Sequence, residues 1–467
     1  MAIGIGEKRF KNPLVQTEQA VAAFVTIAGL MKHLLLMTVA LSSLAFSETK
    51  VFSGFTLIDG AGGTPVANAA MIVTNGKISW IGTKANLKSP TGAEVVDLTG
   101  KFVMPGIINL HGHLGMTKGL VQDAKNFTRE NLQANLATYA AYGVTSVLSM
   151  GSDQPLVFDV RAEQRAGRPT VARIFTAGRG FTGKEGYPTK AAGMKGVPYE
   201  ITEEKQATQF VSEQAAKGVD IIKIWVDDHL GKEPKIQLNL SKAIIEAAQK
   251  RGLRVAAHIF YLKDAKDLVG AGLSGLAHSV RDQDVDQELI DLMKKKGAWQ
   301  MAATFTRELS VFAYTKDAPF LHDAFFTKGV TPAVLATLAS KEFQGKQDHE
   351  AELYRGFLKT AQRNLKKLAD AGVKWGFGTD TGPPGRFPGF FEHLEMELMA
   401  EAGFTPIQII SAFSKQNAEY LGVEKTQGTL TSGKWADMVV LTKSPLVDIR
   451  NSRSIDSVWI GGGRVMR

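Results

Sequence analysis

The feature that most constrains the fold of this chain is an alternation of short apolar segments with amphipathic segments between residues 107 and 380. Several apolar segments follow a helix-ending glycine, as in Gly143-Val144 and Gly252-Leu253. Eight segments qualify as strands: 107–114, 144–151, 173–178, 221–228, 255–260, 273–280, 298–304 and 374–380. Eight strand–helix units predict an α/β fold, a (β/α)8 TIM barrel with its active site at the carboxyl ends of the strands. The alternative is an open doubly wound sheet, but no Gly-rich nucleotide fingerprint follows any segment.

Short alternating strands separated by turns occupy residues 49–102, where Asn75-Gly76 is the strongest hairpin signal in the chain. Strand-like segments return at 428–441 and 455–464. Neither terminal region is long enough to bury a core alone, so we expect both to combine into one small β-sandwich domain. The predicted organisation places the N-terminal half of the β-sandwich at 48–103, the barrel at 104–425 and the C-terminal half of the β-sandwich at 426–467.

Residues 1–47 are predicted to be an N-terminal extension and a secretory signal peptide. Met31, Lys32 and His33 precede an apolar run at 34–46 that is too short to span a bilayer, and Ala45 and Ser47 are small residues at cleavage spacing. The alternative is one uncleaved anchor beginning near residue 20, but it would bury Lys32 and His33 in its middle. We therefore expect cleavage and export, periplasmic or secreted, with no membrane segment in the mature protein.

The charge distribution and the absence of cysteine exclude several classes of function and of metal site. The net charge of +9 is not concentrated in a Lys/Arg patch with interleaved aromatic residues, so nucleic-acid binding is not expected. The chain has no cysteine, which excludes disulfides, cysteine-ligated zinc and a thiol nucleophile. Any metal is therefore left to histidine, carboxylate and modified lysine side chains.

Polar side chains occur on five of the predicted strands, at or near their ends. His111 and His113 are two residues apart, so in an extended strand their imidazoles point to the same face, which suits a shared metal. Later strands add four more groups: Lys223, His258, His278 and Asp380. An unpaired buried polar group costs about 1–3 kcal/mol, and a shared metal centre would remove this cost. The alternative is six unrelated buried polar residues.

The chain resembles the amidohydrolase superfamily, in its branch of imidazolonepropionase-related and Xaa-Pro dipeptidase-like binuclear metal hydrolases. The resemblance runs from about residue 50 to the end of the chain. It rests on MPGIINLHGH at 104–113, on GTLTSGKWADMVVL and SPLVDIRN near the C-terminus, and on the order of Lys223, His258, His278 and Asp380. Asn109 departs from the family pattern, which more often has Asp two residues before the first histidine.

The resemblance implies a role for each residue. His111, His113 and Asp380 would hold one divalent ion, and His258 and His278 the second, with zinc as the default metal. Lys223 would be carboxylated by CO2 and bridge both ions, since a free ammonium has no lone pair for a metal and would be repelled by it. Two bridged ions lower the pKa of a shared water, and Asp380 would take its proton and pass it to the leaving amine.

The implied activity is hydrolysis by metal-activated hydroxide of an amide bond in a small molecule, a dipeptide or an N-acyl amino acid. Hydrolysis of a cyclic amide, a urea or an ester on the same metals is the alternative within this class. A barrel scaffold that has lost its chemistry is a second alternative, but such a scaffold would be expected to lose ligands, and all six are present.

Substrate contacts are expected in the loops that follow the strands. In the Gly-rich loop at 179–188, Arg179 and Tyr187 are candidates to hold a substrate carboxylate; an ordinary solvated loop is the alternative. Trp225 follows Lys223 and faces either substrate or a neighbouring helix. The long segment at 313–361 is predicted to form helices that cover the mouth of the barrel or mediate contact in a homo-oligomer.

Overall fold

The structure is a computed structural model that describes Met1 and residues 48–315, 318–348 and 350–466. Thr49–Arg467 forms one compact unit. The predicted extension and signal peptide fall, apart from Met1, outside the described residues and stay a prediction. Within the described part of the chain, no helix combines the length and apolar character that crossing a membrane requires.

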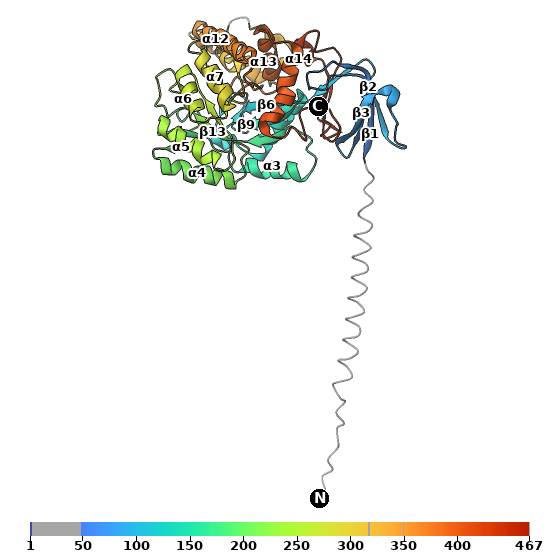
Figure 1. Ribbon diagram of the computed structural model, residues 1–467, viewed down its shortest axis with the longest axis horizontal. Coiled ribbons are helices and arrows are strands. Elements are labelled where there is room, and N and C mark those ends of the chain that lie inside the picture. The colour runs from blue at the N-terminus through green and yellow to red at the C-terminus, as the bar shows by residue number, and fades with distance from the viewer. Residues whose placement is uncertain (2–47, 316–317, 349, 467) are drawn as a thin grey trace. The chain divides into compact units, whose positions relative to one another are not determined.

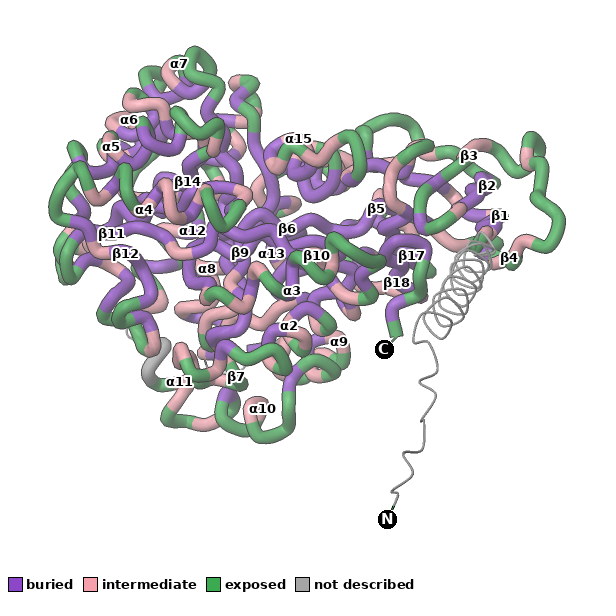
Figure 2. The backbone as a smooth tube through the Cα atoms, turned by 90° about the horizontal axis from the view of Figure 1, so that it is seen from below, coloured by how far each residue is buried: buried purple, intermediate pink, exposed green. Residues whose placement is uncertain are grey.

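Parallel strands alternate with helices through the middle of the chain (Figure 1). One parallel sheet has the order β10-β9-β6, with strands at Arg173–Thr176, Val144–Ser149 and Ile107–Gly112. A second has the order β12-β11-β13-β14-β15-β16, with strands at Tyr199–Ile201, Phe181–Gly183, Ile222–Trp225, Val255–His258, Gly275–Leu276 and Trp299–Gln300. Seven of the eight predicted segments thus contain a strand, and Figure 2 shows four of these strands, β6, β9, β10 and β14, as mostly buried.

The eighth predicted segment, 374–380, is not a continuous strand, but it is hydrogen bonded on both sides. Trp375 forms a parallel bridge with β16. On the other side, the amide of Leu110 donates to the carbonyl of Phe377 at 3.0 Å, and the amide of Asp380 donates to the carbonyl of His111 at 2.7 Å. Asp380 has a φ of +60°, in the left-handed region, which ends the extended run at this residue.

Helices follow the strands and lie around them (Figure 1). They are α2 (Arg129–Ala141), α3 (Leu156–Ala166), α4 (Glu204–Ala216), α5 (Leu238–Gln249), α6 (Leu262–Gly270), α7 (Gln287–Lys296), α8 (Phe305–Ser310), α12 (Ala351–Asp370), α13 (Phe390–Glu401), α14 (Pro406–Ser411) and α15 (Asn417–Leu421). In α5, Leu240, Ile244 and Ala248 recur at helical spacing and share one apolar cluster with β13 and β14. Gly252, shortly beyond α5, has a left-handed φ of +68° that favours glycine, as predicted for a helix-ending position.

Both ends of the chain contribute to a single mixed sheet. Its order is β19-β18-β17-β5-β1-β2-β3 with β4 also paired to β1, and the strands are β1 (Thr49–Leu57), β2 (Val66–Thr74), β3 (Lys77–Thr83), β4 (Glu94–Asp97), β5 (Phe102–Pro105), β17 (Met438–Leu441), β18 (Ile455–Ile460) and β19 (Gly463–Arg464). β5 and β17 pair antiparallel, with Met104 opposite Val439, so the two ends do combine. Asn75 and Gly76 join β2 to β3 as the predicted hairpin. The two-layered sandwich and the predicted domain boundaries stay predictions.

The long segment at 313–361 forms short helices: η3 (Pro319–His322), α9 (Ala324–Thr327), α10 (Pro332–Leu338), α11 (Lys341–Asp348) and the beginning of α12. Tyr314, Phe326 and Leu338 are buried in one cluster with Phe390 of α13. The hydroxyl of Tyr314 donates to the carbonyl of Gly385, in the loop that follows Asp380. The segment therefore packs against that loop, and the predicted oligomer contact stays a prediction.

Asn417, at the start of α15, holds β6 to the eighth segment. Its Nδ2 donates to the carbonyls of Ile108 at 2.6 Å and Phe377 at 2.7 Å, and its Oδ1 accepts from the amide of Phe377 at 2.9 Å. Asn417→Ala removes these partners from buried backbone groups, so we expect the free energy of unfolding to fall by about 3 kcal/mol in urea titrations. Asn239→Ala, whose amide bonds Glu204 at the surface, is the matched control, and equal losses would contradict this assignment.

Candidate metal centre

Five of the six predicted ligands line one cavity of about 300 Å³ at the carboxyl ends of the central strands: His111, His113, His258, His278 and Asp380. They come from four separate strands or strand ends. The sixth predicted ligand, Lys223, is fully buried on β13, two residues before Trp225, which also lines the cavity. The structure therefore brings all six side chains to one place.

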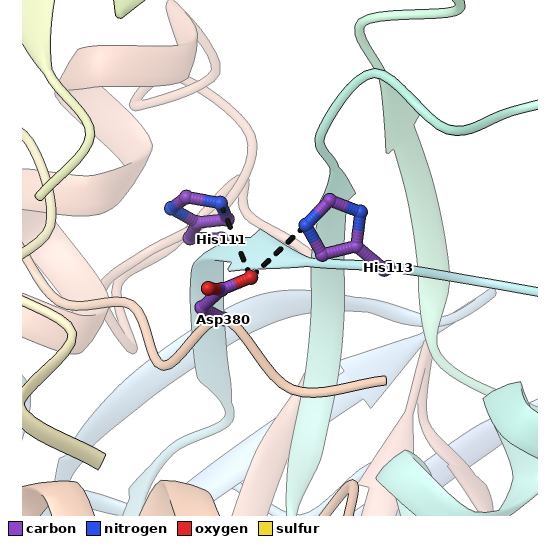
Figure 3. A group of neighbouring side chains, drawn as sticks. All are labelled: His111, His113 and Asp380. Atoms are coloured by element: carbon purple, nitrogen blue, oxygen red, sulfur yellow. Dashed lines mark ion pairs between the residues drawn. The ribbon is translucent and has the colours of Figure 1, made fainter. Parts of the chain in front are cut away.

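His111, His113 and Asp380 converge on one another (Figure 3). Oδ1 of Asp380 lies 3.0 Å from Nε2 of His113 and 3.6 Å from Nε2 of His111. One ligand atom from each residue lies within 4.8 Å of the other two, a spacing that suits a single metal ion. The opposite ring nitrogens have partners: Nδ1 of His111 lies 3.0 Å from the carbonyl of Ala277, and Nδ1 of His113 lies 2.8 Å from the hydroxyl of Ser152. These partners orient both Nε2 atoms toward the carboxylate.

His258 and His278 lie beside this group. Their ring centroids are 4.1 Å apart, and His278 is 4.7 Å from His111. Nδ1 of His278 lies 2.7 Å from the hydroxyl of Thr304, whereas its Nε2 is buried with no hydrogen-bond partner among the described residues. Nε2 of His258 lies 2.6 Å from Oδ2 of Asp227, which leaves Nδ1 for another partner. Because an unpartnered buried nitrogen costs free energy, this donor set fits a second metal ion that would satisfy it.

Burial keeps the imidazoles neutral. It lowers the pKa of His258 to about 3 and holds the pKa values of His111 and His278 well below their usual range. Burial alone would raise the pKa of Asp380, but the Arg386 guanidinium and the neighbouring histidines outweigh it and hold that pKa well below its usual range. Neutral imidazoles with an ionised carboxylate are a donor set that divalent ions such as zinc accept.

Lys223 lies within this cluster. Its Nζ is 3.4 Å from Nε2 of His111 and 5.5 Å from the ring centroid of Trp225. Burial lowers the pKa of the Lys223 ammonium to about 7. Near neutral pH, a substantial fraction of this lysine is therefore the free amine, which carries a lone pair.

Two arginines contact the other oxygen of Asp380. Nη1 of Arg386 donates to Oδ2, and Nε of Arg307 lies 3.8 Å from the same atom. Sequence reasoning assigns no role to Arg307, Arg386 or Asp227. Arg307 and Arg386 lie shortly after predicted strands, and Asp227 lies at the end of the predicted strand 221–228. That position is the signal that could have identified them, since barrel enzymes place polar residues in these loops.

A buried network supports the ligands from behind. Asn109, where the family pattern more often has Asp, donates from Nδ2 to Oε1 of Glu392 at 2.7 Å, and its Oδ1 accepts from the amide of His111 at 2.9 Å. The hydroxyls of Thr379 and Thr381 each donate to the same carboxylate oxygen at 2.8 Å. Glu392 of α13 thus fixes β6 and the two neighbours of the predicted catalytic carboxylate at once.

Two of the three predicted substrate contacts line the cavity. Tyr187 and Trp225 are both in its wall, and the Tyr187 ring lies 5.1 Å from that of His258. Arg179 is not in the wall: its guanidinium donates to the carbonyls of residues 196–198 and lies 4.1 Å over the Tyr199 ring. The geometry does not support a substrate contact for Arg179, because its side chain fixes its own loop.

Comparisons with known sequences identify a family and relatives of this chain. The profile described as the amidohydrolase family matches residues 102–465. The chain is similar to ochratoxinase from Aspergillus niger, with 26% identity over 455 residues, 89% of this chain and 86% of that protein. It is also similar to imidazolonepropionase from Acinetobacter baumannii (strain ACICU), with 23% identity over 433 residues, 85% and 91% of the two chains.

Solved structures share the fold. A putative prolidase from Bifidobacterium longum matches with a TM-score of 0.72 and 24% identity, over 90% of this chain and 95% of that one. A Xaa-Pro dipeptidase with bound methionine matches with a TM-score of 0.70 and 21% identity, over 89% and 99%. The neighbours are of the TIM-barrel type, and the resemblance drawn from the motifs is confirmed. The chain belongs to the amidohydrolase family and is a hydrolase acting on carbon–nitrogen bonds.

Proposed function

We propose that this protein is a binuclear metal-dependent hydrolase that cleaves an amide bond in a dipeptide or an N-acyl amino acid. The observation that carries the proposal is the convergence of His111, His113 and Asp380 beside a second histidine pair, in which Nε2 of His278 is buried and has no partner among the described residues. The first three residues would hold one divalent ion, and His258 and His278 the second, with zinc as the default. The names of the relatives, ochratoxinase and Xaa-Pro dipeptidase, support an amide-type substrate.

Lys223 is the bridging residue in this proposal, after its amine has reacted with CO2 to give a carbamate. Only the free amine reacts, and burial makes that form accessible near neutral pH. The 3.4 Å between its Nζ and Nε2 of His111 puts the amine next to the first ligand group. A carbamate supplies two oxygens and a negative charge, which suits a position between two cations.

The reaction follows from the site. Two bound divalent ions would supply Lewis acidity, which lowers the pKa of a water molecule and polarises the scissile carbonyl. The Asp380 carboxylate takes a proton from the attacking water and returns it to the nitrogen of the leaving amine. Tyr187 and Trp225 form part of the wall that surrounds the substrate and restricts bulk water.

We also infer that the central strands close into a (β/α)8 barrel. Between β10 and β13, the amide of Asp220 donates to the carbonyl of Thr176 at 2.8 Å. Beyond β16, the amide of Gln300 donates to the carbonyl of Lys374 at 2.9 Å, and the eighth segment bonds to β6 on its far side. Continuous hydrogen bonding of this kind explains how the first strand and the eighth segment bring His111 and Asp380 together.

Metal analysis combined with a substrate screen tests the proposal. Protein loaded with zinc in bicarbonate buffer is expected to hold close to two equivalents per chain and to hydrolyse members of a library of dipeptides and N-acyl amino acids. Hydrolysis of cyclic amides, ureas or esters alone would select the alternative substrate class on the same metals. Neither bound metal nor hydrolysis, with zinc, manganese and cobalt all tried, would overturn the proposal in favour of an inactive scaffold.

Asp380→Asn tests the proton-transfer role. The amide cannot take up the proton of the attacking water, so kcat is expected to fall roughly 10³-fold while the metal content stays close to that of the wild type. Steady-state kinetics on the best library substrate and metal analysis of the same sample measure both quantities. Asp370→Asn, at an exposed residue of α12, is the matched control. Near-normal turnover in a metal-replete Asp380→Asn protein would refute the role.

Asp227→Asn tests the support of His258. Loss of the charged partner at 2.6 Å releases the orientation of the imidazole and lowers its basicity, so we expect metal affinity to fall roughly 10- to 100-fold. Competition with a metal chelator measures the affinity without any need for turnover. Asp228→Asn changes the neighbouring carboxylate, which accepts from the Tyr261 hydroxyl instead, and should leave the affinity unchanged. Equal affinities in wild type and Asp227→Asn would show that Asp227 does not position the ligand.

A further inference from the structure

Around Asp380, arginines outnumber the carboxylates that pair with them. Arg281 and Arg307 share Glu308, at 2.9 and 2.6 Å. Arg307 also lies 3.8 Å from Asp380, and Arg386 contacts the same oxygen. All five side chains are at most 16% exposed. Three guanidinium groups thus share two carboxylates, and a third carboxylate nearby, Asp227, acts electrostatically on Arg281 and Arg307.

The single negative charge of Asp380 is shared between His113 on one side and two arginines on the other. Its Oδ1 faces His113 and the proposed metal position, while its Oδ2 faces the arginines. A divalent cation bound to this carboxylate would weaken the electrostatic attraction between Asp380 and Arg386. Arg307 keeps Glu308, whereas Arg386 has no second carboxylate within ion-pair distance in the described part of the chain. Of the three arginines, Arg386 is therefore the one whose charge a bound anion would best compensate.

Arg386 is also the arginine that reaches the cavity. It is part of the cavity wall, and the other wall residues include no second permanently charged cation. The remaining wall is largely apolar: Met116, Pro188, Ala191, Met194, Trp225 and Pro384. A ligand that fits such a wall presents an apolar group to most of it and one anionic group to the guanidinium.

The loop that carries Arg386 is held in place. The amide of Gly382 donates to the carbonyl of Arg386 at 2.9 Å, and the amide of Arg386 donates to the carbonyl of Pro383 at 3.0 Å. Gly382 has a φ of +117°, and a Cβ there would lie 2.1 Å from the carbonyl oxygen of His113, so the loop lies directly against that residue. A guanidinium on a fixed loop loses little entropy when it binds an anion.

We propose that Arg386 binds the α-carboxylate on the amine side of the scissile bond, so that the enzyme releases free α-amino acids with apolar side chains. This inference rests on the proposed amide hydrolysis at the same site. Water adds to the acyl carbon, the carbon–nitrogen bond breaks, and the amine leaves with the bonding electron pair and the proton held by Asp380.

The position of the arginine selects the α-carboxylate. The leaving nitrogen must lie next to Asp380 to receive its proton, and an α-carboxylate carbon is two bonds from that nitrogen. Arg386 donates to Asp380. A carboxylate on the α-carbon of a leaving amine beside Asp380 is therefore within reach of this guanidinium. Two parallel hydrogen bonds from a guanidinium to a carboxylate give both affinity and orientation.

N-acetyl-L-phenylalanine and N-acetyl-L-phenylalaninamide test the proposal, with release of acetate by zinc-loaded, full-length protein as the readout. For wild type, kcat/KM is expected to be roughly 100-fold higher for the acid than for the amide. Arg386→Met should bring this ratio close to one by loss on the acid, and Arg386→Lys should restore some of it. Arg129→Met, a surface arginine paired with Glu163, is the matched control and should leave the ratio unchanged.

A ratio near one in the wild type, or a ratio that survives in Arg386→Met, would overturn the proposal. A merely structural role of Arg386 would lower both rates together and leave their ratio intact, so that outcome also counts against a carboxylate site.

Binding separates this inference from the proposed function. Calorimetry with 3-phenylpropanoate and 3-phenylpropanamide needs no turnover, and the wild type should bind the acid at least roughly tenfold more tightly than the amide. That preference should vanish in Arg386→Met; equal binding of the acid by both proteins would overturn the inference. Arg386-dependent binding of the acid in a protein that hydrolyses no amide would count against the proposed function alone.

Discussion

The arrangement of the site depends on the free-energy cost of burying polar side chains. Four imidazoles and a carboxylate line one cavity beside the buried Lys223 amine, and burying each of these polar groups would be unfavourable without partners. The surrounding protein satisfies one nitrogen of each imidazole, through groups such as the Ser152 hydroxyl and the Asp227 carboxylate, and leaves the other nitrogen turned inward. The ring orientations are thus set from outside the cluster, before any ion binds.

Backbone strain is found in the same place. Asp380 has a left-handed φ, which costs roughly 1 kcal/mol or more for a residue with a side chain. Its two neighbours, Thr379 and Thr381, both donate to Glu392, and its amide donates to the carbonyl of His111. These hydrogen bonds fix the backbone before and after Asp380. The carboxylate is therefore held in an orientation that a regular strand would not give it.

The sequence predicts the scaffold well and the loops poorly, for physical reasons. Apolar periodicity and helix-ending glycines depend on local chemistry, so they locate seven strands and, on or just after them, five of the six predicted ligands. The eighth segment is hydrogen bonded on both sides without forming a continuous strand, and its extended run ends at the left-handed Asp380. The prediction that Arg179 contacts substrate is not supported, because a long side chain in a loop can bond its own backbone, and no periodicity reveals that choice. The contact between Arg386 and Asp380 depends on loop geometry in the same way.

The pairing of β5 with β17 has a consequence for how this protein is made. β5 ends at Pro105, and β6, which carries His111, begins at Ile107. The first ligand strand therefore continues from β5, which pairs with β1 on one side and with residues 438–441 on the other. During synthesis, the edge of β5 that pairs with β17 has no partner strand until residues 438–441 have emerged from the ribosome. A prematurely terminated chain would therefore expose an unpaired strand edge able to associate with other chains, and would not be a smaller working enzyme.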